Sequence, residues 1–274
     1  MTGVLMDELP GTAGALLREL GGRARLHDLY DDVGSAVYDD LCAADTSEVR
    51  EILHLLRGTK GPVLELAAGS GRLTLPILAG GHEVVALELS PTMLGMLVDR
   101  LDAAPARLRD RCSTVRGDMS RFALGRKFGA IVLGTTSISL LDRPQRERLY
   151  AAVAEHLAPG GRFLVTTIYL DTTEATETET EFRFTGASGR YYRLIEYWPT
   201  DAAARTVTVL PAEPAEGPVD VCVSSVRVLS ADQLETELRA AGLVTRARHT
   251  LLGEGLRYRD VLLEVEVEAE VEVG

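Results

Sequence analysis

The chain has 274 residues, which suit one large α/β domain or one domain with a substantial insertion. Hydrophobic residues make up 46% and charged residues 26%, the balance of a globular chain that can bury a core. The net charge is −12, because 41 acidic residues outnumber 29 basic ones. An acidic surface repels phosphate, so the composition argues against nucleic-acid binding through a general basic face and against binding to anionic membranes.

The cysteines point to a reducing compartment. Cys42, Cys112 and Cys222 are odd in number and far apart, so they indicate neither a disulfide framework nor a zinc site. The opening MTGVLMDELPGTAG lacks the basic head and apolar stretch of a signal peptide. No run approaches the roughly 18 apolar residues that cross a bilayer. We therefore expect a cytoplasmic protein with no metal and no membrane partner.

Residues 1–60 are predicted to form a helical N-terminal cap. Leucines at 16, 17 and 20, and apolar residues at 49, 52, 53 and 56, recur at helical spacing, and Gly21-Gly22 separates the two stretches. Between them lies a short segment with two tyrosines, Tyr30 and Tyr38.

From residue 61 strands and helices alternate. This pattern predicts a doubly wound, mostly parallel, Rossmann-like sheet of seven strands. The expected strands are 63–66, 84–87, 114–116, 130–134, 162–168, 245–251 and 260–267, and the expected helices are 72–78, one from Pro91, 144–157 and 230–241. The main domain is thus predicted over 61–169 and 230–267.

The alternation stops between residues 170 and 229. An acidic low-complexity stretch at 172–181 is followed by β-rich runs at 190–198, 204–210 and 219–229, punctuated by prolines. We interpret this segment as an antiparallel β insertion that forms a lid over the substrate. The glutamates of the acidic stretch would attract a cationic amine, although a solvated loop explains them equally well.

The strongest motif is the glycine-rich turn after the first strand of the sheet. Its sequence, Glu65-Leu-Ala67-Ala-Gly69-Ser-Gly71-Arg72, lets a ligand approach the backbone at a helix N-terminus. A dinucleotide fingerprint would place a third glycine where Thr74 stands, so the motif loses support as a pyrophosphate site.

Acidic residues close the next two predicted strands. Glu88 could accept hydrogen bonds from both ribose hydroxyls, with Leu89 beside it. Asp118 could accept from an adenine amino group while Met119 packs on the ring. A strand-end acid is ordinarily solvated. The glycine-rich turn, Glu88 and Asp118 at three consecutive strand ends nevertheless predict a nucleoside site.

With these motifs the sequence resembles the class I S-adenosylmethionine-dependent methyltransferases over residues 61–168. The turn Leu157-Ala158-Pro159-Gly160-Gly161 adds to the resemblance. The chain looks most like N-methyltransferases of peptide natural products, including glycopeptide-antibiotic and daptide-type ribosomal peptide enzymes. The related sugar-amine N,N-dimethyltransferases share the tyrosine pair and the β-rich insertion.

The resemblance implies S-adenosylmethionine as cofactor. It also implies that the tyrosine pair contacts the cofactor and that an arginine after the glycine turn pairs with its methionine carboxylate. The expected cofactor residues are Tyr30, Tyr38, Glu65, Ala67, Gly69, Gly71, Arg72, Glu88, Leu89, Asp118, Met119, Gly134 and Thr135.

The chemistry requires a neutral amine, because an ammonium has no lone pair. An α-amine is roughly a tenth neutral at pH 7, so no strong base is obligatory. Candidates near the reacting amine are Thr135, Thr136, Ser137, Tyr169 and His249, and the first three are favoured because many enzymes of this class place the reacting atom near the fourth strand of the sheet. His82 and His156 look like surface positions.

The expected substrate is a terminal amine of a peptide, methylated once or twice. Aromatic residues at 191, 192, 197 and 198 would line the lid, unless they form a small secondary core or a homodimer contact. The alternatives are an aminosugar on a nucleotide carrier, a non-catalytic cofactor-binding partner and an NAD-dependent oxidoreductase. A diphosphate carrier would require grouped cations, and the insertion arginines, at 183, 190, 193 and 205, show no obvious grouping.

Overall fold

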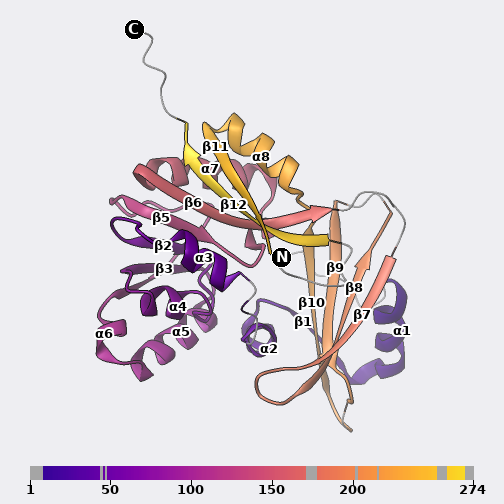
Figure 1. The fold of residues 1–274 in the computed structure, drawn as a ribbon. Helices are drawn as coiled ribbons and strands as arrows, with labels where there is room; N and C mark the ends of the chain where they lie inside the picture. The colour runs from indigo at the N-terminus through magenta and orange to yellow at the C-terminus, as the bar shows by residue number, and fades with distance from the viewer. Residues whose placement is uncertain are drawn as a thin grey trace. The chain divides into compact units, whose positions relative to one another are not determined.

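The computed structural model describes residues 9–43, 46, 48–170, 178–200, 203–214, 216–251 and 258–268. The chain divides into two compact units, both drawn in Figure 1. The α/β unit comprises Thr46–Asp171 and Leu229–Gly274. The strand-rich unit comprises Met1–Asp45 and Thr172–Val228.

The α/β unit contains a seven-stranded sheet in the order β11-β12-β6-β5-β2-β3-β4. Strands β2 to β6 run parallel, and β12 lies antiparallel between β6 and β11. The prediction of a mostly parallel seven-stranded sheet is confirmed. The strands are β2 (Val63–Leu66), β3 (Val84–Glu88), β4 (Cys112–Arg116), β5 (Phe128–Leu133), β6 (Leu157–Leu170), β11 (Leu243–Thr250) and β12 (Tyr258–Val267).

Helices cover both faces of this sheet. Successive side chains of a strand point to opposite faces, so Leu64 belongs to the apolar cluster that contains α7 and α8, while Val63 belongs to the cluster that contains α3, α4 and α5. The arrangement is the doubly wound one expected from the sequence (Figure 1). The helices are α3 (Val49–Leu55), α4 (Thr74–Ala79), α5 (Pro91–Ala103), α6 (Ala106–Arg109), η3 (Ser137–Leu140), α7 (Arg143–His156) and α8 (Ala231–Ala240).

Side-chain caps fix where three of these helices begin. The hydroxyl oxygen of Ser90 accepts from the Met93 N–H at the start of α5, where Pro91 occupies the first helical position. Asp142 begins α7 with a capping box, and Ser230 caps α8. Since α5 follows directly on β3, the Ser90 cap also fixes the length of that loop at the carboxyl edge of the sheet.

The strand-rich unit holds a five-stranded sheet in the order β1-β10-β9-β8-β7. All pairs are antiparallel except β1 with β10. The insertion therefore has one strand more than the three predicted runs, because β7 begins within the acidic stretch. Residues 172–177 of that stretch lie outside the described residues. The elements are α1 (Gly11–Leu20), η2 (Gly21–Arg23), β1 (Ala24–Asp28), α2 (Asp32–Cys42), β7 (Thr178–Thr185), β8 (Tyr191–Trp198), β9 (Ala204–Pro211) and β10 (Val219–Arg227).

The N-terminal segment differs from the predicted cap of residues 1–60. Residues 24–28 form a strand rather than a helix, because their backbone pairs in parallel with residues 219–223 of β10. This pairing groups the segment up to Asp45 with the insertion, whereas the helix at Val49–Leu55 belongs to the α/β unit. The helical character expected around Leu16, Leu17 and Leu20 is confirmed by α1.

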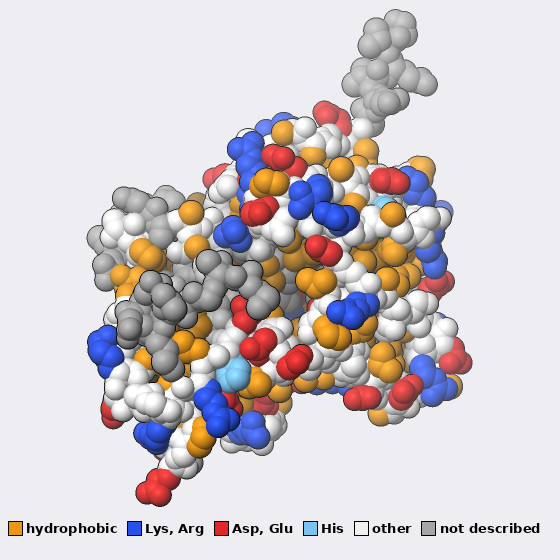
Figure 2. Space-filling model, turned by 180° about the vertical axis from the view of Figure 1, so that it is seen from behind, with side chains coloured by type: hydrophobic (Ala, Val, Ile, Leu, Met, Phe, Trp, Pro, Cys, Tyr) orange, Lys and Arg blue, Asp and Glu red, His pale blue; other side chains and the backbone are white. Residues whose placement is uncertain are grey.

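The described surface carries charges of both signs. On the face shown in Figure 2, acidic and basic side chains alternate and neither sign forms a continuous area. Among the described helices, none is long and apolar enough to cross a membrane. Within the same residues, His, Cys, Asp and Glu side chains form no group that could hold a metal ion.

Candidate functional site

The glycine-rich turn joins the end of β2 to α4. Ala67, Gly69 and Gly71 all have positive φ, at 52°, 57° and 96°. A Cβ on Gly71 would lie 2.5 Å from Leu97 Cδ1, so Gly71 permits close packing against α5. A Cβ on Gly69 would meet only the Met93 sulfur, at 3.8 Å. The backbone at Gly69 is therefore the part of the turn that a ligand can approach.

Glu88 links this turn to the neighbouring strand. It ends β3 and is only 7% exposed. Its Oε2 accepts from the Gly69 N–H at 2.8 Å, and its Oε1 accepts from the Ser90 N–H at 2.7 Å. A carboxylate oxygen accepts more than one hydrogen bond, so Glu88 keeps acceptor capacity for a ligand's hydroxyls.

Glu65 is buried beneath the turn. Its Oε2 accepts from the Thr74 hydroxyl at 2.6 Å, and 2% of the residue is exposed. Burial raises the pKa of Glu65 to about 8, although the Thr74 hydrogen bond and the charge of Arg72 act in the opposite direction. Near pH 7 this carboxyl is thus mostly protonated.

The third strand end carries Asp118. Strand β4 lies next to β3, and the Gly117 N–H donates to the Glu88 carbonyl at 3.0 Å. Asp118 Oδ1 accepts from the Ser120 N–H at 2.7 Å, which leaves Oδ2 for a ligand. Met119 is 9% exposed and Leu89 is 60% exposed. An apolar side chain so exposed beside Glu88 is suited to packing against a planar ring.

Arg72 lies in the turn before α4, which begins at Thr74 rather than at the expected residue 72, and its guanidinium is already paired. Nη2 contacts Glu48 Oε1 and donates to the Thr135 hydroxyl at 2.5 Å. Glu48, directly before α3, was not singled out in the sequence. It was missed because its partners are 24, 87 and 118 residues away, so no local motif marks it. The pairing of Arg72 with a cofactor carboxylate stays a prediction.

The predicted substrate contacts occupy different places in the α/β unit. Thr135 and Thr136 form the turn after β5 with φ of 57° and 53°, and Gly134 precedes them. Tyr169 is 46% exposed near the end of β6. His249 lies on β11, with Nδ1 3.3 Å from Glu51 and Nε2 3.6 Å from Glu264. Thr135 accepts a hydrogen bond from another predicted site residue, Arg72, and the Gly134 carbonyl accepts from the Ser137 N–H at 3.0 Å.

In the strand-rich unit, Tyr30 and Tyr38 are neighbours, with ring centroids 5.3 Å apart. Both pack against the apolar cluster built on Leu29, Tyr192 and Val209. Burial raises the pKa of Tyr30 well above its usual range, so its hydroxyl stays protonated. Their contact with the cofactor stays a prediction.

His156 is buried rather than on the surface, which corrects the sequence-based expectation. It is 2% exposed and packs against the Phe122 and Phe128 rings. Nε2 accepts from the Leu124 N–H at 2.9 Å, so Nδ1 carries the proton and donates to the Ala152 carbonyl at 2.7 Å. The ring thus holds the segment that follows Asp118 and Met119 against α7.

The strand-end residues fit an adenosyl sulfonium. Strands β2, β3 and β4 are parallel neighbours, so their carboxyl ends meet at one edge of the sheet, where ligands of open α/β folds bind. That edge offers an open glycine backbone at Gly69 and carboxylate oxygens at Glu88 and Asp118. Because Glu48 already neutralises Arg72, acidic groups dominate the edge, which suits a cationic ligand.

Comparison with known proteins agrees with this geometry. Residues 63–161 match the family model described as a methyltransferase domain. The chain is similar to the solved structure of the glycopeptide N-methyltransferase MtfA complexed with sinefungin, with 38% identity and a TM-score of 0.69 over 94% of this chain and 97% of that one. The structure of MtfA with S-adenosylmethionine has a TM-score of 0.66 and 36% identity.

Two curated relatives match shorter segments. A dTDP-3-amino-3,4,6-trideoxy-alpha-D-glucopyranose N,N-dimethyltransferase of Streptomyces venezuelae is 33% identical over 45% of this chain and 49% of its own length. A dTDP-4-amino-2,3,4,6-tetradeoxy-D-glucose N,N-dimethyltransferase of Saccharopolyspora spinosa is 30% identical over 49% of this chain and 51% of its own. The chain spans about half the length of these curated relatives.

Proposed function

Because the chain belongs to the class I S-adenosylmethionine-dependent N-methyltransferases, we propose that it methylates a terminal amine of a peptide natural product, of the glycopeptide or daptide-like ribosomal class. The observation that carries the cofactor assignment is the hydrogen bond between Glu88 and the Gly69 backbone, with Asp118 at the next strand end. Bound S-adenosylmethionine supplies the electrophilic methyl group.

Each strand-end group has a defined task in this proposal. Glu88 accepts from the ribose hydroxyls, Asp118 accepts from the adenine amino group, and Leu89 and Met119 pack on the rings. The Gly69 backbone meets the amino-acid part of the cofactor. The contact of Tyr30 and Tyr38 with the cofactor is a further prediction. The affinity of the double variant Y30F/Y38F for S-adenosylmethionine tests it.

The protein's contribution to the transfer is positional. The amine must be neutral, and an α-amine has enough neutral form at pH 7 to react without a dedicated base. Holding the amine in line with the methyl group and excluding water lower the barrier. Thr135 and Thr136, in the turn after β5, are the proposed neighbours of the reacting amine.

The arginines of the insertion favour a peptide over a nucleotide-linked sugar. Arg193 and Arg183 both pair with Glu181, and Arg205 pairs with Glu196 3.3 Å away while lying over the Trp198 ring. A diphosphate carrier would have to compete with these carboxylates for the same cations. Among solved structures, the glycopeptide enzyme matches 94% of the chain at 38% identity, and an amino pentose methyltransferase matches 87% of it at 19% identity.

A methyl-transfer assay read by mass spectrometry tests the proposal. Peptides with free N-terminal amines are compared with the same peptides acetylated at the N-terminus and with dTDP-aminosugars. We expect mass gains of one or two methyl groups on the free-amine peptides alone. Transfer to the aminosugars only would replace the peptide assignment with the sugar one, and binding of S-adenosylmethionine without transfer to any amine would favour a non-catalytic partner.

A further inference from the structure

Glu48 is the most heavily used buried carboxylate at the carboxyl edge of the sheet. It is 3% exposed, and its backbone carbonyl accepts from the Ile52 N–H at 2.9 Å as α3 begins. Its position is therefore fixed by the helix, while its side chain reaches the ends of the strands. Glu48 is not among the proposed cofactor or substrate contacts.

The carboxylate collects donors from three separate elements. Both oxygens lie 2.9 Å from the Thr135 backbone nitrogen, and the Thr135 hydroxyl donates to Oε1 at 3.1 Å. The Thr166 hydroxyl, on β6, donates to Oε2 at 2.6 Å. The Arg72 guanidinium completes the set. A single side chain thus ties together the glycine-rich turn, the end of β5 and β6.

The turn that Glu48 holds is strained. Thr135 and Thr136 are β-branched residues with positive φ, a conformation that such side chains rarely adopt and that persists only where the surroundings impose it. Gly134 allows the carboxylate to come close, since a Cβ there would lie 3.0 Å from Glu48 Oε1 and 2.5 Å from Leu73 Cδ1. The hydrogen bond from the Thr135 N–H ties this strained turn to the buried Glu48 carboxylate.

We propose that Glu48 is a positioning residue, which holds the Thr135–Thr136 turn and the Arg72 side chain in the geometry that methyl transfer requires. It acts through Thr135 and does not touch the substrate. The predicted effect of Glu48 on turnover rests on the proposed function. The predicted effect of Glu48 on the Thr135–Thr136 turn is independent of any substrate.

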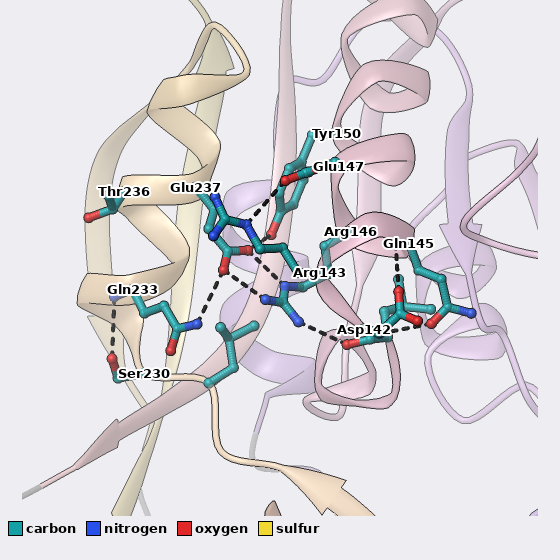
Figure 3. Close-up of polar contacts among 12 residues, drawn as sticks. Asp142, Arg143, Gln145, Arg146, Glu147, Tyr150, Ser230, Gln233, Thr236 and Glu237 are labelled. Atoms are coloured by element: carbon teal, nitrogen blue, oxygen red, sulfur yellow. Dashed lines mark hydrogen bonds and ion pairs between the residues drawn. The ribbon is translucent and has the colours of Figure 1, made fainter. Parts of the chain in front are cut away.

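The chain offers a matched control on the opposite face of the sheet. Glu237 of α8 is also a largely buried carboxylate paired with an arginine: Arg146 of α7 donates to both of its oxygens at 2.7 Å, and the Tyr150 hydroxyl donates at 2.9 Å (Figure 3). A Glu237→Gln change therefore breaks a comparable ion pair without touching the strand ends. Both Glu48→Gln and Glu237→Gln break a largely buried ion pair, and only Glu48→Gln does so at the strand ends.

The test compares wild type, Glu48→Gln, Thr166→Val and Glu237→Gln. The Thr166→Val variant removes one donor to Glu48 and keeps the ion pair with Arg72, so it folds even if Glu48→Gln does not. Amide hydrogen exchange over residues 135–139 is measured without ligand. In parallel, kcat and KM are measured with S-adenosylmethionine and a peptide that the wild type methylates.

With Glu48→Gln we expect exchange over the turn to become at least about tenfold faster and kcat to fall on the order of 10²-fold, with a smaller change in KM for the peptide. Thr166→Val should change the exchange rate of the turn and kcat in the same direction, but by less. Glu237→Gln should lower thermal stability and leave the exchange rate and kcat unchanged. Equal exchange in Glu48→Gln and Glu237→Gln would overturn the inference. Because exchange needs no substrate, its result stands even where no peptide is methylated.

Discussion

The Glu88 carboxylate, at the end of β3, accepts a hydrogen bond from the Gly69 backbone N–H in the turn after β2, at 2.8 Å. Its other oxygen accepts from Ser90 at the start of α5. One side chain therefore fixes the separation of two strand ends and of the helix that follows. A ligand that bridges the two strand ends meets groups already in place, and this preorganisation favours binding.

Replacing Glu88 with alanine should weaken the binding of S-adenosylmethionine at least about tenfold, because charge-assisted hydrogen bonds to the ribose are lost. Isothermal titration calorimetry measures the change. Glu83→Ala is the control, since Glu83 precedes the same strand but is half exposed and pairs with Arg126. Equal affinities in the wild type and in Glu88→Ala would remove the ribose assignment.

Replacing His156 with leucine should lower the free energy of unfolding by about 1–3 kcal/mol, because the partly buried Leu124 N–H loses its acceptor. Urea denaturation measures this loss. His82→Leu serves as the control, because His82 is partly exposed. A Leu variant as stable as the wild type would show that the ring nitrogen is not the partner that the Leu124 N–H requires.

The raised pKa of Glu65 gives the stability a defined dependence on pH. Burial places the pKa at about 8 in the folded chain, against 4.5 for an ordinary glutamate in water. Below the lower value both the folded and the unfolded state are protonated. Between the two values only the folded state keeps the proton, so stability falls as pH rises and then levels off.

Glu65→Gln should abolish this slope, because an amide does not titrate. The free energy of unfolding of the variant, relative to that of the wild type, should rise by a few kcal/mol between about pH 5 and about pH 8. Denaturation series at these two pH values measure the difference. Parallel pH profiles of the two proteins would contradict the buried, protonated carboxyl.

Asp40 connects α2 to the β7–β8 hairpin within the strand-rich unit. It accepts from the Ser188 N–H at 2.6 Å, the Ser188 hydroxyl at 2.7 Å and the Tyr192 hydroxyl at 2.9 Å. These hydrogen bonds hold the pKa of Asp40 below its ordinary value, although burial alone would raise it. The stabilisation is therefore present above the ordinary pKa and is lost as pH falls through the lowered one.

Asp40→Asn should lower the melting temperature at neutral pH, and the difference from wild type should close in acid, below about pH 4. Differential scanning calorimetry follows both effects. Glu213→Gln, on an exposed side chain of the same unit, should change neither. A difference that persists unchanged in acid would show that the carboxylate charge is not what Asp40 contributes.

The features that sequence predicted correctly are local. Gly69 follows β2 by three residues, Glu88 ends the apolar strand β3, and Asp118 lies just beyond β4, so spacing alone places them at one edge of a parallel sheet. The parallel direction of these strands follows from their alternation with helices. No long-range contact has to be known for this part of the site.

The features that sequence missed depend on distant partners. Strand β1 exists because it pairs with β10, some 195 residues later, and its own residues show no strong strand pattern. Glu48 looks like an ordinary acid at a helix start until β5 and β6 bring Thr135 and Thr166 to it. His156 was placed on the surface because its burial depends on Phe122 and Phe128, which reach it only in the folded unit.

The most direct measurement is a crystal structure of the chain with S-adenosylhomocysteine. We predict the ribose hydroxyls on the Glu88 carboxylate, the adenine beside Asp118 and Met119, and the amino-acid end along the backbone at Gly69. A nucleoside bound elsewhere in the chain, or a chain that does not bind it at all, would contradict the account.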